Sequence, residues 1–133
     1  MQKSKVEVFA LSNRGDARGL SFSVPGEGLA FVGNLGDVHF VSSKPGAIRG
    51  NHYHLRRREA TIVLPGSNWS LYWAEGPDEE AQSRQFDGAT AVLVLIEPKT
   101  PHAMLNHGPG ELWLFAIQSE ANDSSDWVPR KLV

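Results

Sequence analysis

The chain has 133 residues, a hydrophobic fraction of 41%, a charged fraction of 21% and a formal net charge of −2 at pH 7. These values are ordinary for a globular protein and give no reason to expect a nucleic acid as partner. The chain contains no cysteine, which excludes disulfides, thiolate metal sites and cysteine nucleophiles. No apolar run approaches the roughly 18 residues of a membrane span, and no secretory signal is visible, so we expect a cytoplasmic protein without membrane contact.

Short apolar runs separated by glycine and proline dominate the chain. The 13 glycines and 8 prolines interrupt it every several residues, and the runs between them are rich in Val, Ile, Leu, Phe and Trp. This pattern is typical of many short strands in a sandwich or barrel, and the length suits a single domain over residues 1–133. The expected strands are Val6–Leu11, Gly19–Val24, Ala30–Val32, Asp37–Ser42, Gly50–His54, Glu59–Leu64, Trp69–Ala74, Gln85–Phe86, Ala91–Ile96, Ala103–Asn106 and Leu112–Gln118.

Two segments depart from the strand pattern. The stretch Glu75–Arg84 is polar and acidic, and we expect a surface loop or a short solvated helix there. The tail from Glu120 to Val133 has no strand pattern. We expect it either to form a short helical turn or to lie extended over the barrel, with Trp127 packed against the body of the protein.

Four possible metal ligands lie in or beside the expected strands. His52 and His54 are two residues apart on one strand, so their side chains point to the same face, about 7 Å apart. Glu59 opens the next strand, and His102 comes from a different strand. Three neutral imidazoles and one carboxylate suit Zn, Fe, Mn, Ni or Co, with positions left open for water or substrate. We therefore predict a divalent transition-metal site, with zinc as the first expectation, against a metal-free catalytic or merely structural role.

The spacing of these residues resembles the first sequence motif of the cupin family. Gly46, five residues, His52-x-His54, four residues, Glu59, six residues and Gly66 fill every specified position of that motif, here residues 46–66. The resemblance implies an all-β fold consisting of a single small cupin barrel, that is, a double-stranded β-helix or jelly roll, with an N-terminal strand extension.

The second cupin motif, near residues 88–106, is matched in part. Pro98 lies near the expected proline, His102 takes the histidine position, and Asn106 follows after three residues. Lys99 replaces the usual glycine of the turn, and Glu97 replaces its first proline. The match at His102 supports its assignment as the third imidazole of the site.

A narrower resemblance comes from the residues around the first motif. The segment Arg49-Gly50-Asn51-His52-Tyr53-His54 is similar to the Arg-Gly-x-His-x-His segment of cupins that act on nucleotide-linked keto-sugars, in particular the cupin domain of capsular-polysaccharide reductase/epimerases. The turn Asn13-Arg14-Gly15-Asp16 is similar to the N-termini of sugar-nucleotide epimerases and ketoisomerases. The resemblance implies polysaccharide biosynthesis, a nucleotide-linked 4-keto-sugar as small-molecule substrate, and a homodimer that exchanges N-terminal strands.

The implied reaction removes a proton from the carbon next to the ketone and returns it on the other face or at another carbon. A metal held by the four ligands would polarise the ketone as a Lewis acid. Without metal, His52 or His54 would act as the base, and these two are the expected catalytic residues. The expected substrate-binding residues are Arg49, Asn51, Tyr72 and Asn106.

Several neighbouring residues have ordinary structural explanations as well. Arginine suits a diphosphate, but the run Arg56–Arg58 is expected to be a solvated turn. Tyr72 is expected to stack on a sugar or a base, or else to pack in the core. Asn106 is expected to support His102 or a turn, and His39 and His107 are treated as structural because no spacing argument involves them.

Two other functions remain open at this point. Three histidines and a glutamate are also the ligand set of some cupin dioxygenases, which use a redox metal such as iron or nickel. A cupin that only binds a sugar or another small molecule would keep the pocket, yet lack a second, independent acid or base. The fold alone does not decide among the three, because cupins share one barrel across unrelated chemistries.

Overall fold

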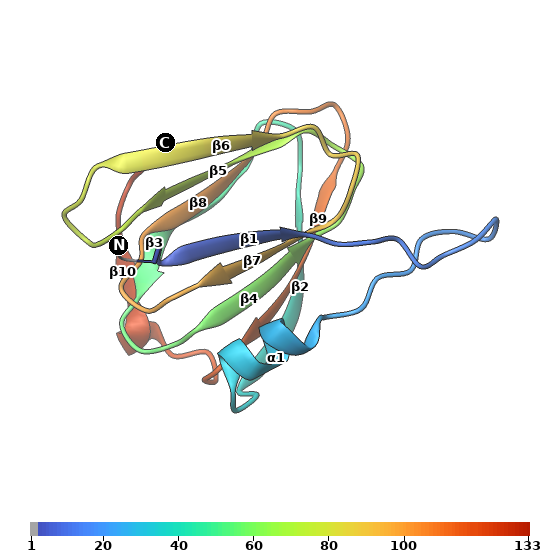
Figure 1. The fold of residues 1–133 in the computed structure, drawn as a ribbon. Helices are drawn as coiled ribbons and strands as arrows, with labels where there is room; N and C mark the ends of the chain where they lie inside the picture. Colours follow the sequence, from blue (N-terminus) through green and yellow to red (C-terminus); the bar gives the residue numbers. More distant parts are fainter. Residues whose placement is uncertain (1–2) are drawn as a thin grey trace.

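A computed structural model describes residues 3–133 and shows two antiparallel sheets packed face to face. The first sheet has the strand order β1-β7-β4-β9-β2, and the second has the order β10-β3-β8-β5-β6. Figure 1 shows the sheets as the two walls of a small barrel. The first sheet comprises β1 (Val6–Ala10), β7 (Val92–Ile96), β4 (Glu59–Val63), β9 (Leu112–Gln118) and β2 (Asp37–Ser43). The second comprises β10 (Trp127–Pro129), β3 (Ile48–His54), β8 (His102–Asn106), β5 (Trp69–Ala74) and β6 (Ala81–Phe86).

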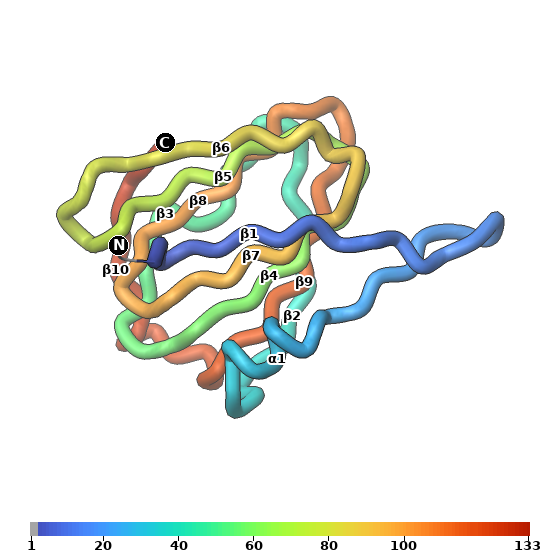
Figure 2. Tube along the Cα trace, in the orientation of Figure 1, coloured from blue at the N-terminus to red at the C-terminus, as the bar shows by residue number. Residues whose placement is uncertain are grey.

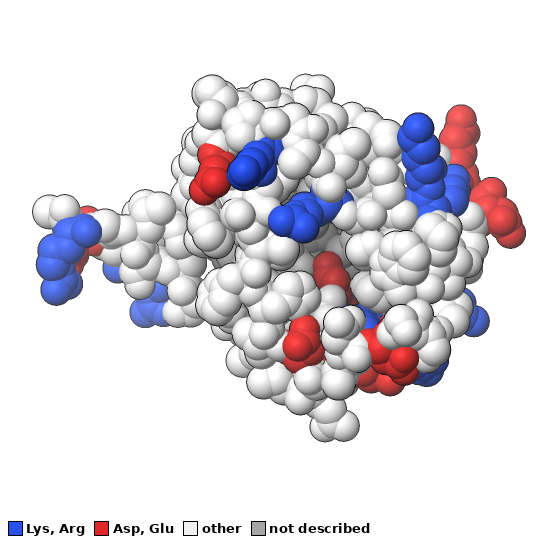
Figure 3. Space-filling view, turned by 180° about the vertical axis from the view of Figure 1, so that it is seen from behind, with Lys and Arg blue, Asp and Glu red and all other residues white. Residues whose placement is uncertain are grey.

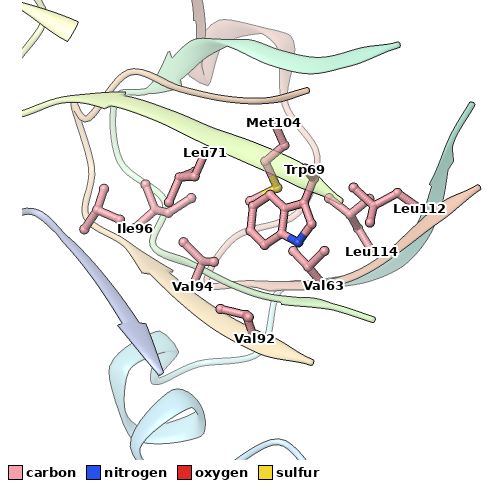
Figure 4. Packing of buried hydrophobic residues seen from close by; sticks show 10 residues of the cluster. Val63, Trp69, Leu71, Val92, Val94, Ile96, Met104, Leu112 and Leu114 are labelled. Carbon is pink, nitrogen blue, oxygen red and sulfur yellow. The ribbon is translucent and has the colours of Figure 1, made fainter. Parts of the chain in front are cut away.

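The main core fills the space between the sheets. Figure 4 shows Leu71, Trp69 and Met104 of the second sheet pointing toward Val63, Val94 and their neighbours in the first. These side chains are almost fully buried, and Trp69 also stacks on Phe86 with a ring separation of 4.3 Å. The core occupies one end of the barrel and leaves the other end to polar side chains.

A second apolar cluster covers the outer face of the first sheet. The helix α1 (Gly26–Val32) lies against β4 and β7, as Figure 1 shows, and buries Val32 against Ile62 and Leu95. The prediction of a strand at Ala30–Val32 is therefore wrong. Gly28 and Val32, the two buried residues of α1, are four residues apart, which is helical spacing; a short apolar run by itself does not distinguish helix from strand.

The N-terminal extension consists of the strand β1, which pairs with β7, and an arm that follows it. Residues 12–21 extend away from the body, as the tube in Figure 2 shows, whereas Leu11 before them and Phe22 and Val24 after them pack against the second apolar cluster. The arm is folded on itself by a hydrogen bond from Arg14 N to Ser21 O and by an isolated bridge between Asp16 and Gly19. The strand expected at Gly19–Val24 is absent from the described residues, because that segment has no neighbouring strand to pair with.

Two further segments differ from or extend the sequence-based expectations. β6 begins at Ala81 instead of Gln85, so the last four residues of the expected polar loop are strand; the exposed polar side chains of β6 suit an edge strand. The tail combines both alternatives, because a 3₁₀ turn at Ser124–Asp126 precedes β10, which pairs with β3.

The prediction of a small cupin barrel is confirmed. Among residues 3–133, no helix is long and apolar enough to cross a membrane.

Gly50 lies where β3 passes closest to β8. Its φ is 108°, and a Cβ placed there would lie 2.6 Å from the carbonyl oxygen of His102. Gly46 also has a positive φ, of 80°, but a Cβ there would meet no atom within 4 Å. A side chain at Gly46 would therefore meet backbone strain only, whereas a side chain at Gly50 would meet both backbone strain and steric overlap with β8.

We expect Gly46→Ala to lower the free energy of unfolding by about 1–2 kcal/mol, the cost of a positive φ in a residue with a Cβ. Gly50→Ala should cost about 1–3 kcal/mol more, because the added methyl group overlaps the backbone of β8. Urea unfolding of both variants measures the difference. Equal losses would show that β3 and β8 can separate freely at this point.

Candidate functional site

Three imidazoles meet at the polar end of the barrel. His52 and His54 come from β3 and His102 from β8, and the backbone register pairs His52 with His102. The ring centroid of His52 lies 4.9 Å from that of His54 and 4.9 Å from that of His102. Each of the three rings offers one nitrogen, and these three nitrogens lie within 4.8 Å of one another. A bulge at Asn51, with φ of 58°, shifts the register between Gly50 and His52. The structure therefore brings the three predicted imidazoles together on one face.

Glu59 completes this cluster from the opposite sheet. Its Oε1 lies 3.9 Å from Nε2 of His54, and its Oε2 lies 3.9 Å from Nε2 of His102. The carboxylate accepts hydrogen bonds from Gln118 Nε2 at 2.7 Å and from Thr61 Oγ1 at 2.8 Å. These bonds hold Glu59 in place, and each carboxylate oxygen keeps a further lone pair that can face an imidazole or a metal ion.

Burial controls the charge of the cluster. It lowers the pKa of His52 to about 3 and that of His54 to about 4, with the neighbouring imidazole of His102 adding to the effect. Burial alone would raise the pKa of Glu59, but the facing histidines and the bonds from Gln118 and Thr61 hold it well below its usual range. At neutral pH, His52 and His54 are therefore neutral and face a negative carboxylate, an arrangement that attracts a cation.

The residues present fit a divalent metal. His102 donates its Nδ1 proton to the carbonyl oxygen of Thr100 at 2.9 Å, which leaves the lone pair of Nε2 free as a ligand. Metal–ligand distances near 2.0–2.2 Å allow two ligand atoms of one ion to lie about 4 Å apart, as the carboxylate and imidazole atoms do. His54 Nδ1 is buried without a hydrogen-bond partner and lies 3.6 Å from Asp126 Oδ2.

A buried ion pair connects the C-terminal tail to the cluster. Arg57 and Asp126 are 3% and 1% exposed, and Arg57 Nε donates to Asp126 Oδ2 at 3.0 Å. Arg57 also donates to Gln118 Oε1 at 2.7 Å, and Gln118 in turn donates to Glu59. The expectation that the whole arginine run is a solvated turn is therefore wrong for Arg57, because a second buried charge compensates its burial.

The cluster lies in a cavity of about 290 Å³. Its walls combine the ionisable groups with apolar side chains such as Met104 and Leu114, and Trp127 of the tail stands at its edge, 5.8 Å from the ring of His52. The rear view in Figure 3 shows a hollowed face with acidic atoms lying deep and basic side chains close by. Pockets that combine apolar walls with a few converging polar groups are typical of small-molecule sites.

The predicted substrate-binding residues do not all reach this cavity. Arg49 lines it, with its guanidinium bonded to the carbonyl oxygen of Ser42. Asn51 instead binds the tail, donating to Val133 O and accepting from Leu132 N.

The other two predicted contacts also lie away from the cavity. Tyr72 lies between Leu71 and Trp73, which pack into the core, so its side chain faces the other side of the sheet. Asn106 is fully buried in the turns at the far end of the barrel, where its side chain bonds Ser43 O and Gly110 O.

Sequence reasoning missed several residues of the cavity. His39, Arg57, Gln118 and Trp127 all line it, although none belongs to a cupin motif as matched here. The alternation of Asp37, His39 and Val41 along an expected strand was the one available signal, because it places all three on one face. The other residues depend on strand register and on the path of the tail, which single-sequence patterns do not specify.

Comparisons with known proteins agree with this fold. Residues 14–126 match the model of a family described as the polysaccharide biosynthesis C-terminal domain. No curated protein matches the chain. Of the solved structures, QdtA from Thermoanaerobacterium thermosaccharolyticum, a sugar 3,4-ketoisomerase in complex with TDP, is similar with a TM-score of 0.72 and 20% identity over 93% of this chain and 87% of its own.

Two other solved structures are similar as well. ChmJ from Streptomyces bikiniensis, a 3'-monoepimerase in complex with dTDP-quinovose, has a TM-score of 0.77 and 17% identity over 94% of this chain and 69% of its own. The capsular polysaccharide assembling protein CapF from Staphylococcus aureus has a TM-score of 0.65 and 23% identity over 92% of this chain and 35% of its own. At these identities the likeness establishes the fold.

We expect Arg57→Met to lower the free energy of unfolding by about 3–5 kcal/mol, because it removes the buried partner of Asp126 and leaves only the more distant, exposed guanidinium of Arg56. Arg56 is the matched control: it is the preceding residue, its bonds to Glu120 and Asp123 are exposed, and its guanidinium lies 3.8 Å from Asp126, against 3.0 Å for Arg57. Arg56→Met should cost no more than about 1 kcal/mol. Chemical denaturation compares the two variants, and similar losses would contradict the role of Arg57 as the buried anchor of the tail.

Proposed function

The chain belongs to the polysaccharide biosynthesis C-terminal domain family, and on that premise we propose that it is an epimerase or isomerase of a nucleotide-linked 4-keto-sugar. The observation that carries the proposal is the cluster of His52, His54, His102 and Glu59 inside a cavity that also has apolar walls. Structures of the same fold support it, because a histidine-to-asparagine mutant of QdtA is described in complex with TDP-4-keto-6-deoxyglucose and ChmJ with dTDP-quinovose.

The chemistry of the substrate class explains why such a cluster is needed. A carbon next to a ketone is a weak acid, and its proton leaves only if the negative charge that develops on the ketone oxygen is stabilised. In the proposed complex the ketone oxygen faces His52, His54 and His102. Arg49 at the wall of the cavity is suited to the diphosphate, because a guanidinium forms paired hydrogen bonds with phosphate oxygens.

We propose further that this cluster holds a divalent transition metal, with zinc as the first candidate. His52, His54, His102 and Glu59 would be the ligands, and the metal would supply Lewis acidity at the ketone oxygen. The low pKa of His52 and of His54 supports this use, since an imidazole with a pKa of about 3 or 4 is a weak base but remains a ligand at neutral pH. If no metal is present, His52 or His54 is left as the base.

The proposal predicts hydrogen exchange at the substrate. Incubated in D₂O with a 4-keto-6-deoxyhexose linked to TDP or UDP, the protein should introduce deuterium at the carbon next to the ketone, measured by mass spectrometry and NMR. His52→Asn should lower the exchange rate by about 10²-fold or more and also lower the bound metal, measured by elemental analysis of the same samples.

His107→Asn is the matched control for this experiment. His107 bonds Ser70 at the opposite end of the barrel, so the control should exchange and bind metal as the wild type does. Absence of exchange by the metal-loaded wild type would overturn the proposed reaction. Oxygen consumption with the same substrate would favour the dioxygenase alternative, and unchanged metal in His52→Asn would overturn the metal site.

We also infer a homodimer, and the support is an exposed apolar patch on the edge of the first sheet. Val38 and Phe40 of β2 and Trp113 of β9 lie on its outer face, with Phe40 71% exposed. Phe40→Ser should shift the protein toward monomer in sedimentation velocity at micromolar concentration, whereas a wild type that is already monomeric would contradict the inference. The cytoplasmic location expected from the sequence stays a prediction.

A further inference from the structure

A second histidine site faces the same cavity from the opposite sheet. Along β2 the outward side chains are Val38 and Phe40, so Asp37, His39 and Val41 point inward, and His39 and Val41 line the cavity. The imidazole of His39 is 43% exposed, so a molecule entering the cavity can reach it. His39 is therefore accessible from the space that the three-imidazole cluster faces.

Asp37 fixes the proton of His39. Nδ1 of His39 lies 2.7 Å from Oδ2 of Asp37. An ionised carboxylate only accepts hydrogen bonds, so Nδ1 carries the proton, and the lone pair of a neutral imidazole is then on Nε2. Among residues 3–133, no hydrogen bond from another residue occupies Nε2 of His39. This is the arrangement of a base held in one tautomer by a neighbouring carboxylate.

The strand register sets the separation between His39 and the strand of Glu59, the member of the cluster that lies on the same sheet. His39 pairs with Ala116 of β9, and Ala116 pairs with Thr61 of β4, two residues after Glu59. Two strand spacings separate β2 from β4, or about 9.6 Å. Ala116 lies between them on this row and Thr61 ends it; both line the cavity with small side chains, so no large side chain fills this wall between His39 and Glu59.

The proposed reaction requires a base that the cluster does not supply. An imidazole whose lone pair holds a metal ion cannot also take a proton, so the metal-holding form of His52, His54 and His102 lacks a base. A second, independent acid or base is what distinguishes an enzyme from a cupin that only binds its ligand. His39 and Asp37 meet the need from an independent wall of the cavity.

We propose that His39, positioned by Asp37, is the acid–base residue that moves the proton of the substrate; this inference rests on the proposed function. Nε2 of His39 takes the proton from the carbon next to the ketone. The electrons of the broken C–H bond form the C=C bond of an enolate, and the ketone oxygen takes up the negative charge. The protonated His39 then delivers the proton to the former ketone carbon, while the proton of the neighbouring hydroxyl moves to the former ketone oxygen; the ketone is thus moved by one carbon, and no oxidant, reductant or further reactant is consumed.

The test compares variants of the two walls in the deuterium-exchange assay. His39→Gln should lower kcat by about 10²- to 10⁴-fold, while bound metal and the affinity for TDP or UDP by calorimetry stay at the wild-type level. His52→Asn should lose bound metal as well as activity. His107→Gln is the control for replacing a histidine outside the cavity.

Two further variants separate chemistry from structure. Added imidazole should restore exchange to His39→Ala, which a purely structural role would not allow. Asp37→Asn should lower kcat by about 10²-fold or more with KM unchanged, because an amide can donate to Nδ1 and so favour the wrong tautomer of His39.

The outcomes distinguish this inference from the proposed function. If the wild type exchanges and His39→Gln exchanges equally fast, His39 is not the base and the proposed function stands. If His39→Gln loses metal or nucleotide affinity in parallel with its activity, a catalytic role is also overturned. If the metal-loaded wild type shows no exchange, the proposed function and this inference both fail.

Discussion

The burial of one carboxylate is the constraint on which the rest of the site depends. Glu59 lies inside the barrel with its charge retained, and a buried charge is costly unless other groups compensate it. Hydrogen bonds from Gln118 and Thr61 do so, and the chain of contacts continues from Gln118 through Arg57 to Asp126 in the tail. Removing one member would leave a neighbour unpaired, so β4, β9, the tail and the histidine-bearing strands are held in one arrangement.

Sequence patterns predicted the part of this arrangement that depends on spacing alone. Alternation placed His52 and His54 on one face, and the motif spacings brought Glu59 and His102 to the same point. Strand register was not available, so the row that connects His39 through Ala116 to Thr61 could not be foreseen. Arg57 was assigned to solvent for a related reason: a run of three arginines does not reveal which of them has a buried acidic partner. The helix α1 was missed because seven residues are too few to show a helical period clearly.

The turn before β8 shows how a motif can keep its conformation with a different residue. Lys99 stands where the second cupin motif has glycine, and its φ is 60°, the left-handed conformation that glycine adopts readily. This conformation costs a lysine about 1–2 kcal/mol. The Lys99 amide donates to the carbonyl oxygen of His54 at 2.6 Å, which ties the turn to β3 beside the cluster. The substitution therefore leaves His102 facing His52, as the spacing of the motif required.

The proposed separation of a charge-stabilising cluster from a base on the other wall also bears on which reaction the cavity can favour. A base on one wall can remove and return a proton only on the face of the sugar that lies toward that wall. Returning the proton to the neighbouring carbon on the same face, while a hydroxyl proton moves between the two oxygens, converts a 4-keto-sugar into a 3-keto-sugar. Epimerisation needs in addition a proton donor on the other face, where His52, His54 and His102 would be occupied as ligands. A cavity with His39 as its base therefore favours ketoisomerisation within the proposed class.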